Sequence, residues 1–288
     1  MPIILFIWMA LFYTCASAES GMLSGSEFEY KVAPGDYLIK IGARFGVSAK
    51  TIARKNGIGY DDILFPGKRL KLDNRHIVPE GLSDGILINL PQGMLFFFSE
   101  GKFQAAYPVG LGKPSWATPE SDFKVVNLQE NKAWIVPKSI QQEMQREGKA
   151  VLTKVPPGPD NPLGKHWIGL SINGYGIHGT IAPASVYHFQ SHGCIRMQEE
   201  DIAALFPRVK TGMKGRIVYV PLLLAVTGSG RIFIESHPDI YKRKFEYLKT
   251  AHELAGPLGA RVNWELAEEA IARSDGAARD VTLEEGKP

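Results

Sequence analysis

The stretch Ile177-His178-Gly179-Thr180 and, shortly after it, Ser191-His192-Gly193-Cys194-Ile195-Arg196 decides what the rest of the chain has to hold in place. Cys194 is one of only two cysteines, and the other, Cys15, lies in an apolar segment at the N-terminus. A single thiol among glycine and histidine is typical of a nucleophile, because thiols become reactive where a base or a positive field favours the thiolate.

Two histidines are candidate bases for this thiol, His178 upstream and His192 two residues before it. Gly193 lets the backbone come close to a bound carbonyl, so the N–H groups around Cys194 can form an oxyanion hole. The residues alone leave open which histidine is the base.

This motif resembles that of the L,D-transpeptidases of bacterial cell walls, which have a YkuD-type catalytic domain. Their signature is a His-Gly pair, a gap of about a dozen residues and then Ser-His-Gly-Cys-aliphatic-Arg. Further similar stretches are Thr118-Pro119, Arg196-Met197 and the run Pro159-Asp160-Asn161-Pro162-Leu163-Gly164. The resemblance covers residues 84 to 221 and is greatest to the periplasmic ErfK/YbiS/YcfS/YnhG-like group.

The resemblance implies a role for each motif residue. Cys194 is the expected nucleophile, His178 its general base, and the Gly179 carbonyl the group that orients His178. Gly193 is the expected oxyanion-hole residue. His192 and Ser191 are expected near the substrate, although shaping of the loop explains both equally well.

Arg196 has a fork suited to a substrate carboxylate, with a salt bridge inside the loop as the alternative. A metal site is the chemical rival, since His178, His192 and Cys194 can supply three ligands. Their spacing matches no common zinc pattern, and a metal would occupy the thiolate. We therefore expect neither metal nor cofactor.

The implied activity is peptidoglycan L,D-transpeptidation, open to acylation by carbapenems. Cys194 would form a thioester with the diaminopimelate carbonyl of a tetrapeptide stem and release D-alanine. The acceptor amine would come from another diaminopimelate, giving a 3→3 cross-link, or from a lysine of an outer-membrane lipoprotein. Two alternatives stay open: an L,D-carboxypeptidase that uses water, and a glycan-binding scaffold with a silent catalytic domain.

Residues 27 to 73 are expected to form a separate βααβ module. Pro34-Gly35-Asp36 predicts a turn whose aspartate caps the next helix, Gly46 ends that helix, and Ser48 caps the second. The order resembles a LysM module, a family that binds glycans containing N-acetylglucosamine. The alternative is a purely structural cap on the catalytic domain.

Residues 1 to 18 are apolar and end in Ala16-Ser17-Ala18, which predicts a secretory signal cleaved before Glu19. The run is too short for a membrane-spanning helix, so we expect a periplasmic, cell-wall-associated protein without a span in its mature form. An uncleaved anchor is the alternative, because the segment has no Lys or Arg before its apolar run.

From Gly85 onward, short apolar runs between Gly and Pro residues predict a mostly β, antiparallel, sandwich-like domain after a linker at 73 to 83. Helices are expected at 138 to 148 and 201 to 206. In the extension 222 to 288 we expect a strand at 231 to 235 and helices at 241 to 255 and 264 to 273. Residues 274 to 288 look too polar to pack.

Composition limits the partners. The chain has 288 residues, 44% of them hydrophobic, which is enough for two cores. Its net charge of +3 comes from interspersed charges of both signs, so we expect no nucleic acid partner.

Overall fold

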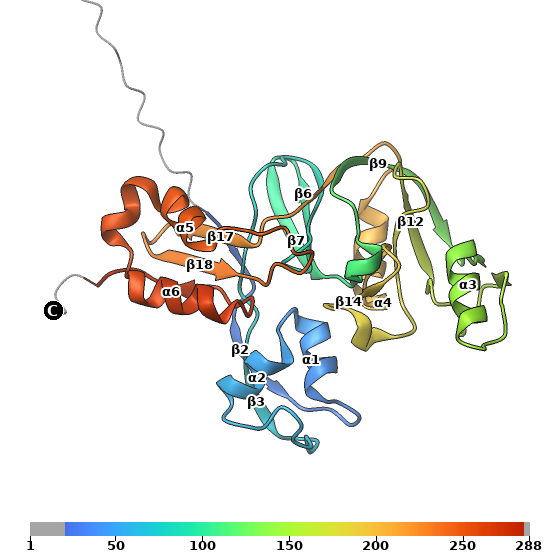
Figure 1. Ribbon diagram of the computed structural model, residues 1–288, viewed down its shortest axis with the longest axis horizontal. Helices are drawn as coiled ribbons and strands as arrows, with labels where there is room; N and C mark the ends of the chain where they lie inside the picture. The colour runs from blue at the N-terminus through green and yellow to red at the C-terminus, as the bar shows by residue number, and fades with distance from the viewer. Residues whose placement is uncertain (1–20, 285–288) are drawn as a thin grey trace, which may run out of the picture.

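The computed structural model describes residues 21–284, which form an N-terminal unit, a central sheet and a C-terminal extension that contact one another (Figure 1). The expected signal at 1 to 18, its cleavage before Glu19 and Cys15 lie outside the described residues. Within 21–284, no helix has both the length and the apolar character needed to cross a membrane.

The N-terminal unit has the expected βααβ order. Strands β2 (Glu27–Lys31) and β3 (Arg69–Asp73) pair antiparallel, and α1 (Leu38–Phe45) and α2 (Ala49–Lys55) pack against them. Gly46 ends α1 in the left-handed region at φ 69°, and the Ser48 hydroxyl caps α2 by accepting the Thr51 N–H at 3.1 Å. Both of these local predictions are confirmed.

The predicted Asp36 cap of the first helix is wrong. The N-cap residue of α1 is Tyr37, which makes no side-chain cap hydrogen bond. Asp36 Oδ2 instead accepts the Ala33 N–H at 2.9 Å and the Tyr30 hydroxyl at 2.5 Å. Asp36 therefore hydrogen-bonds within its own turn and back to Tyr30 of β2, and its carboxylate does not cap α1.

The central sheet has eight strands in the order β15-β13-β12-β9-β16-β5-β6-β7. Most neighbours are antiparallel, as predicted, but the β16–β5 and β13–β15 pairs are parallel. A large core of aliphatic and aromatic side chains, including Ile88, Phe97 and Ile177, packs against this sheet. The strands are β5 (Gly85–Asn89), β6 (Met94–Ser99), β7 (Lys102–Pro108), β9 (Ser121–Glu130), β12 (His166–Leu170), β13 (Gly176–His178), β15 (Ile195–Arg196) and β16 (Lys214–Val218).

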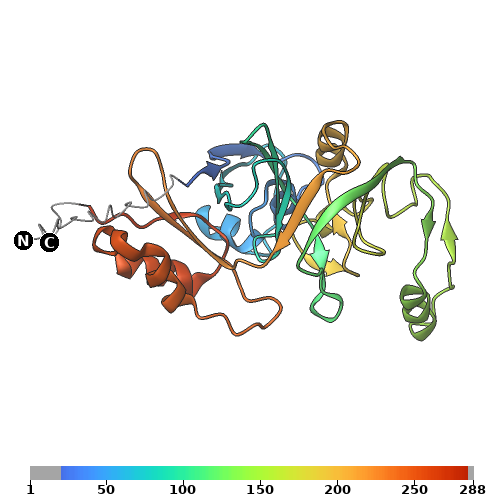
Figure 2. The ribbon, with the colours of Figure 1, turned by 90° about the horizontal axis from the view of Figure 1, so that it is seen from above.

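Two helices accompany this sheet. Helix α4 (Glu199–Leu205) begins with three acidic residues, which suit a helix N-terminus, and buries Ile202 and Leu205. Helix α3 (Lys138–Arg146) belongs to an arm between β9 and β12, together with the hairpin of β10 (Trp134–Ile135) and β11 (Lys154–Val155). The arm lies at one end of the molecule (Figure 2).

The expected linker at 73 to 83 is packed rather than free. It contains β4 (His76–Ile77), which pairs with β1 (Leu23–Ser24), and both residues of β4 are buried. The sequence did not predict this strand, because two residues are too few to show the alternation of apolar and polar side chains that indicates a strand.

In the extension, β17 (Leu222–Val226), β18 (Ile232–Ser236) and β19 (Arg279–Asp280) form a sheet covered by α5 (Tyr247–Ala255) and α6 (Trp264–Arg273). The strand and the second helix are confirmed, but α5 begins six residues later than predicted. The prediction that residues from 274 onward do not pack is wrong up to 284: β19 joins the sheet and Val281 is fully buried.

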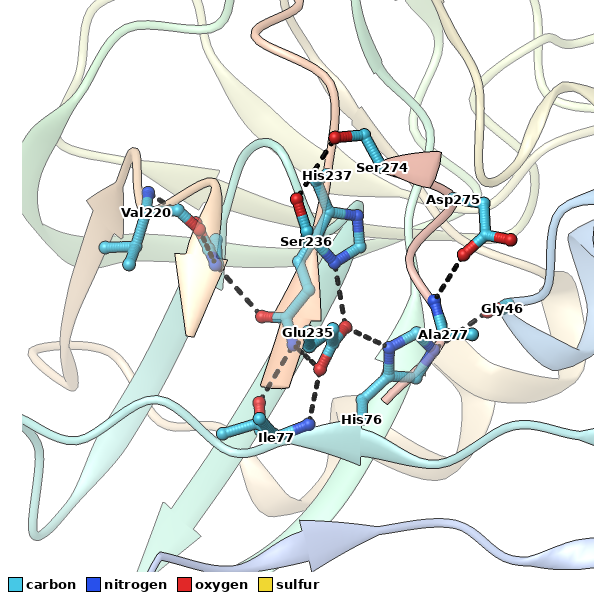
Figure 3. A network of polar contacts seen from close by, with 12 residues as sticks. Gly46, His76, Ile77, Val220, Glu235, Ser236, His237, Ser274, Asp275 and Ala277 are labelled. Carbon is cyan, nitrogen blue, oxygen red and sulfur yellow. Dashed lines mark hydrogen bonds and ion pairs between the residues drawn. The ribbon is translucent and has the colours of Figure 1, made fainter. Parts of the chain in front are cut away.

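A buried polar network centred on Glu235 joins all three parts (Figure 3). Its carboxylate accepts His76 Nδ1 at 2.7 Å, His237 Nε2 at 2.8 Å and the Ile77 N–H at 2.5 Å. Gln92 Nε2 lies 3.1 Å from both carboxylate oxygens. These donors fill the carboxylate, so the group is a hydrogen-bonded ion-pair cluster, although its ligand atoms lie within 4.8 Å of one another as a metal site would require.

His76 carries a proton on both ring nitrogens in this network. Its Nε2 lies 2.8 Å from the Gly46 carbonyl, which only accepts, while Nδ1 faces the carboxylate. Burial lowers the His76 pKa, but the charge of Glu235 together with the hydrogen bonds to Glu235 and to the Gly46 carbonyl outweighs it, so the net pKa is raised. Burial likewise raises the Glu235 pKa, and the two histidines bring it down to about 2.

Candidate active site

The sheet brings the two ends of the motif together. Strands β13 and β15 are parallel neighbours, with Ile177 opposite Ile195 and His178 opposite Arg196. Cys194 directly precedes β15 and lies two positions before Arg196, the partner of His178. Because side chains two positions apart on a strand point to the same face, Cys194 and His178 lie on one face of two adjacent strands, which are about 4.8 Å apart.

His178 is buried, and its ring orientation is fixed. Nδ1 lies 2.6 Å from the Gly179 carbonyl, and the Trp167 ring stacks on the imidazole at 5.9 Å between centroids. Because a carbonyl only accepts, Nδ1 carries the proton and Nε2 has the free lone pair. Burial, with the charge of Arg196, lowers the His178 pKa to about 4, so the ring is neutral at pH 7.

Cys194 is the one free thiol among residues 21–284 and is partly buried. Its Sγ donates to the Gly174 carbonyl at 3.7 Å. Burial raises the pKa of the Cys194 thiol, against the opposing effects of the Gly176 N–H and the Arg196 charge. Both shifts favour the neutral form of the group, the thiol of Cys194 and the uncharged imidazole of His178.

The backbone around Cys194 is held by the Ser191 hydroxyl. Ser191 Oγ donates to the Cys194 carbonyl at 2.6 Å and accepts the Gly193 N–H at 3.1 Å. Gly193 has φ 103°, and a Cβ there would lie 2.7 Å from the Tyr175 ring. Only glycine fits this turn, and its N–H, which we expected in the oxyanion hole, already has Ser191 as a partner.

His192 connects the nucleophile loop to the arm. Its Nε2 hydrogen-bonds to Glu143 of α3, and its ring meets the edge of Trp116 at 5.1 Å. Lys113 Nζ also lies 2.8 Å from Glu143, and these two hydrogen bonds lower the Glu143 pKa to about 2. The imidazole of His192 thus faces the arm.

Arg196 has a fixed backbone and a partly buried side chain. Its N–H and carbonyl both pair with Gly110 at 2.8 Å. Among residues 21–284, no carboxylate lies within 4.0 Å of its guanidinium, so the alternative of a loop salt bridge is not realised there. Its positive charge lowers the pKa of both His178 and Cys194.

Glu199 is a site residue that the sequence did not single out. A Cβ on Gly179 would lie 1.8 Å from Glu199 Oε1, and one on Gly164 would lie 1.7 Å from it. Both glycines therefore make room for this carboxylate, whose Oε1 is buried without a hydrogen-bond partner. The sequence signal that could have indicated this contact was the glycine of the His178-Gly179 pair. Glu199 itself looked like an ordinary acidic residue at the start of a helix.

Comparisons with known proteins identify two domains in this chain. The sequence model of the YkuD family, the L,D-transpeptidase catalytic domain, matches residues 83–220, and that of the LysM domain matches residues 30–73. Fold and motif together define the class, a transpeptidase catalytic domain preceded by a LysM domain. The chain belongs to the L,D-transpeptidase family.

Its relatives carry names from the same family. "Probable L,D-transpeptidase YcfS" of Escherichia coli is 27% identical over 82% of this chain and 80% of its own length. "Putative L,D-transpeptidase YqjB" of Bacillus subtilis is 33% identical over 45% of this chain and 68% of its own length. Among solved structures, an L,D-transpeptidase from Mycobacterium smegmatis is similar over 53% of this chain and 63% of that chain, at 17% identity and a TM-score of 0.39.

Proposed function

We propose that the chain is a cysteine-dependent peptidoglycan L,D-transpeptidase with Cys194 as nucleophile and His178 as general base. The observation that carries the proposal is the tautomer of His178. The Gly179 carbonyl holds the proton on Nδ1 and leaves the Nε2 lone pair available on the strand next to Cys194. The low pKa of His178 keeps that lone pair free at neutral pH.

In the first half-reaction, Cys194 Sγ attacks the carbonyl that joins the L-centre of diaminopimelate to D-alanine. His178 Nε2 takes the thiol proton as the S–C bond forms, because the thiol is not ionised at rest. The tetrahedral oxyanion then collapses, the C–N bond breaks, and His178 returns the proton to the amine of D-alanine. The product is a thioester on Cys194.

In the second half-reaction, an acceptor amine attacks the thioester and gives up a proton to His178, and the thiol is restored. The proposed acceptors are the side-chain amine of another diaminopimelate and a lysine of an outer-membrane lipoprotein. Water in the same place would make the enzyme an L,D-carboxypeptidase.

Arg196 is the proposed site for a stem-peptide carboxylate. Its charge lies close enough to Cys194 and His178 to shift their pKa values, and burial of its guanidinium strengthens an ion pair with a substrate. The His192–Glu143 hydrogen bond links the arm to the nucleophile loop. We propose that the arm lines a second side of the substrate site.

The N-terminal LysM domain supports a peptidoglycan partner, since glycan strands carry the stem peptides. We propose that it holds the enzyme on the polymer, and that the protein acts in the periplasm after secretion. Deleting residues 27 to 73 should then weaken binding to sacculi more than turnover of small muropeptides.

The test is incubation of the purified protein with a disaccharide tetrapeptide, followed by mass spectrometry. A cross-linked dimer and free D-alanine support transpeptidation, whereas tripeptide alone assigns the carboxypeptidase reaction. Cys194→Ala is the matched control and should be inactive while keeping its melting temperature. Unchanged substrate with the wild-type protein, or D-alanine release by Cys194→Ala, would overturn the proposal.

A further inference from the structure

The C-terminal extension reaches the nucleophile loop through a chain of hydrogen bonds. Tyr241, between β18 and α5, donates its hydroxyl to the Gly112 carbonyl at 2.9 Å and accepts the Thr118 N–H at 3.2 Å. The fully buried Thr118 in turn accepts the Gly112 N–H at 3.0 Å and donates to the Gly193 carbonyl at 2.8 Å. The last acceptor is the carbonyl immediately before Cys194.

The contact with Gly193 determines the direction of the next N–H. A peptide bond is planar and trans, so its C=O and N–H point in opposite directions. With the Gly193 carbonyl held by Thr118, the Cys194 N–H points away from Thr118. Ser191 already occupies the Gly193 N–H and the Cys194 carbonyl.

The Cys194 N–H is then the one polar backbone group of the Gly193–Cys194 pair without a partner inside residues 21–284. A backbone N–H next to the nucleophile that has a fixed direction and no hydrogen-bond partner is the kind of donor that stabilises an oxyanion. Its direction depends on Thr118, and the position of Thr118 depends on Tyr241.

Tyr241 is itself anchored by Tyr219 and Phe189, which lie outside the extension. Its N–H donates to the Tyr219 hydroxyl at 3.0 Å, and that hydroxyl donates to Asp239 at 2.5 Å. The rings of Tyr219 and Tyr241 stack at 5.7 Å, and Phe189 meets Tyr241 edge-on at 6.1 Å. The hydroxyl of Tyr241 is therefore a fixed point and not a mobile surface group.

We propose that Thr118 and Tyr241 are positioning residues that aim the Cys194 N–H into the oxyanion hole, so the extension completes the active site. The inference rests on the proposed acyl transfer at Cys194. It gives the segment around residue 241 a part in catalysis beyond packing.

The test compares two reactions of the same thiol. Acylation by a carbapenem passes through an oxyanion as the lactam C–N bond opens, whereas alkylation by iodoacetamide displaces iodide at a saturated carbon and forms none. Tyr241→Phe and Thr118→Val should slow acylation at least ~10-fold, since loss of one oxyanion donor costs about 10²–10³. Their alkylation rates should stay within about twofold of wild type, and Thr118→Ser should restore acylation.

Tyr247→Phe is the matched control, because Tyr247 donates its hydroxyl to the His237 carbonyl in the same extension without touching the loop. It should change neither rate. Equal losses in both reactions, or unchanged acylation in Tyr241→Phe and Thr118→Val, would refute the positioning role.

A second measurement separates this inference from the function. In protein labelled with ¹⁵N-cysteine, Cys194→Ala identifies the Cys194 amide signal. Thr118→Val and Tyr241→Phe should shift that signal and Tyr247→Phe should not. A wild-type protein that no carbapenem acylates would contradict the proposed function, while unmoved amide signals would contradict the inference alone.

Discussion

Replacing Glu235 by alanine should destabilise the whole protein, although the residue lies far from Cys194 in the sequence. The carboxylate is fully buried and accepts hydrogen bonds from His76, Ile77, Gln92 and His237. Its removal leaves a buried imidazolium without its counter-charge and several donors without an acceptor. Breaking a buried ion pair from one side costs roughly 3–5 kcal/mol.

Urea unfolding followed by tryptophan fluorescence measures this cost. We expect Glu235→Ala to lose at least about 3 kcal/mol of unfolding free energy. Glu29→Ala is the control, since Glu29 pairs with Arg69 on the surface and both side chains are more than half exposed. Such exposed pairs contribute about 0–1 kcal/mol.

The pH dependence gives a sharper check. The raised pKa of His76 provides stability that is complete below its unfolded value of 6.5 and is lost as pH rises through the folded value. The lowered pKa of Glu235 provides stability that is present above 4.5 and is lost as pH falls through about 2. The stability difference between wild type and Glu235→Ala should therefore be greatest from pH 4.5 to 6.5. A loss below about 1 kcal/mol, or one that does not vary with pH, would show that the network is not an ion pair.

Three further predictions concern the site. His178→Ala should lower turnover by ~10² to 10⁴, the usual effect of losing a general base, and His192→Ala should lose less; the reverse order in steady-state kinetics would exchange their roles. Arg196→Lys should keep its melting temperature but lose at least ~10-fold in tetrapeptide turnover, about 1.4 kcal/mol of transition-state stabilisation, with a smaller effect on carbapenem acylation. A lower melting temperature with equal losses in both reactions would show that Arg196 only stabilises the loop. Iodoacetamide should alkylate Cys194 faster as pH rises past the ordinary thiol pKa of about 8.5, because the thiol pKa is raised; a plateau at neutral pH would instead indicate a thiolate at rest.

Local patterns in the sequence predicted local structure well. Gly46 and Ser48 mark helix ends because their backbone and side-chain preferences act within a few residues. Asp36 failed for the same reason, since a nearer donor in its own turn competed for the carboxylate. The short motif around Cys194 predicted a candidate site because its residue types are rare in combination.

The sequence did not predict the long-range contacts. His76 and Glu235 carry no pattern that links them, yet they form one buried pair. The segment from residue 274 looked too polar to pack, but charged side chains in it are paired: Arg279 with Asp275, and Asp280 with Arg231. Charge pairing of this kind depends on which strands meet, and composition does not contain that information.

The arm that carries α3 is linked to the nucleophile loop by surface charges. No residue of α3 is buried, so its hold on the nucleophile loop depends mainly on Lys113, Glu143 and His192. Charges near the surface are screened within roughly 10 Å at 0.1 M salt. The link between the arm and the nucleophile loop should therefore loosen as ionic strength rises, whereas the packing of the central sheet should not change.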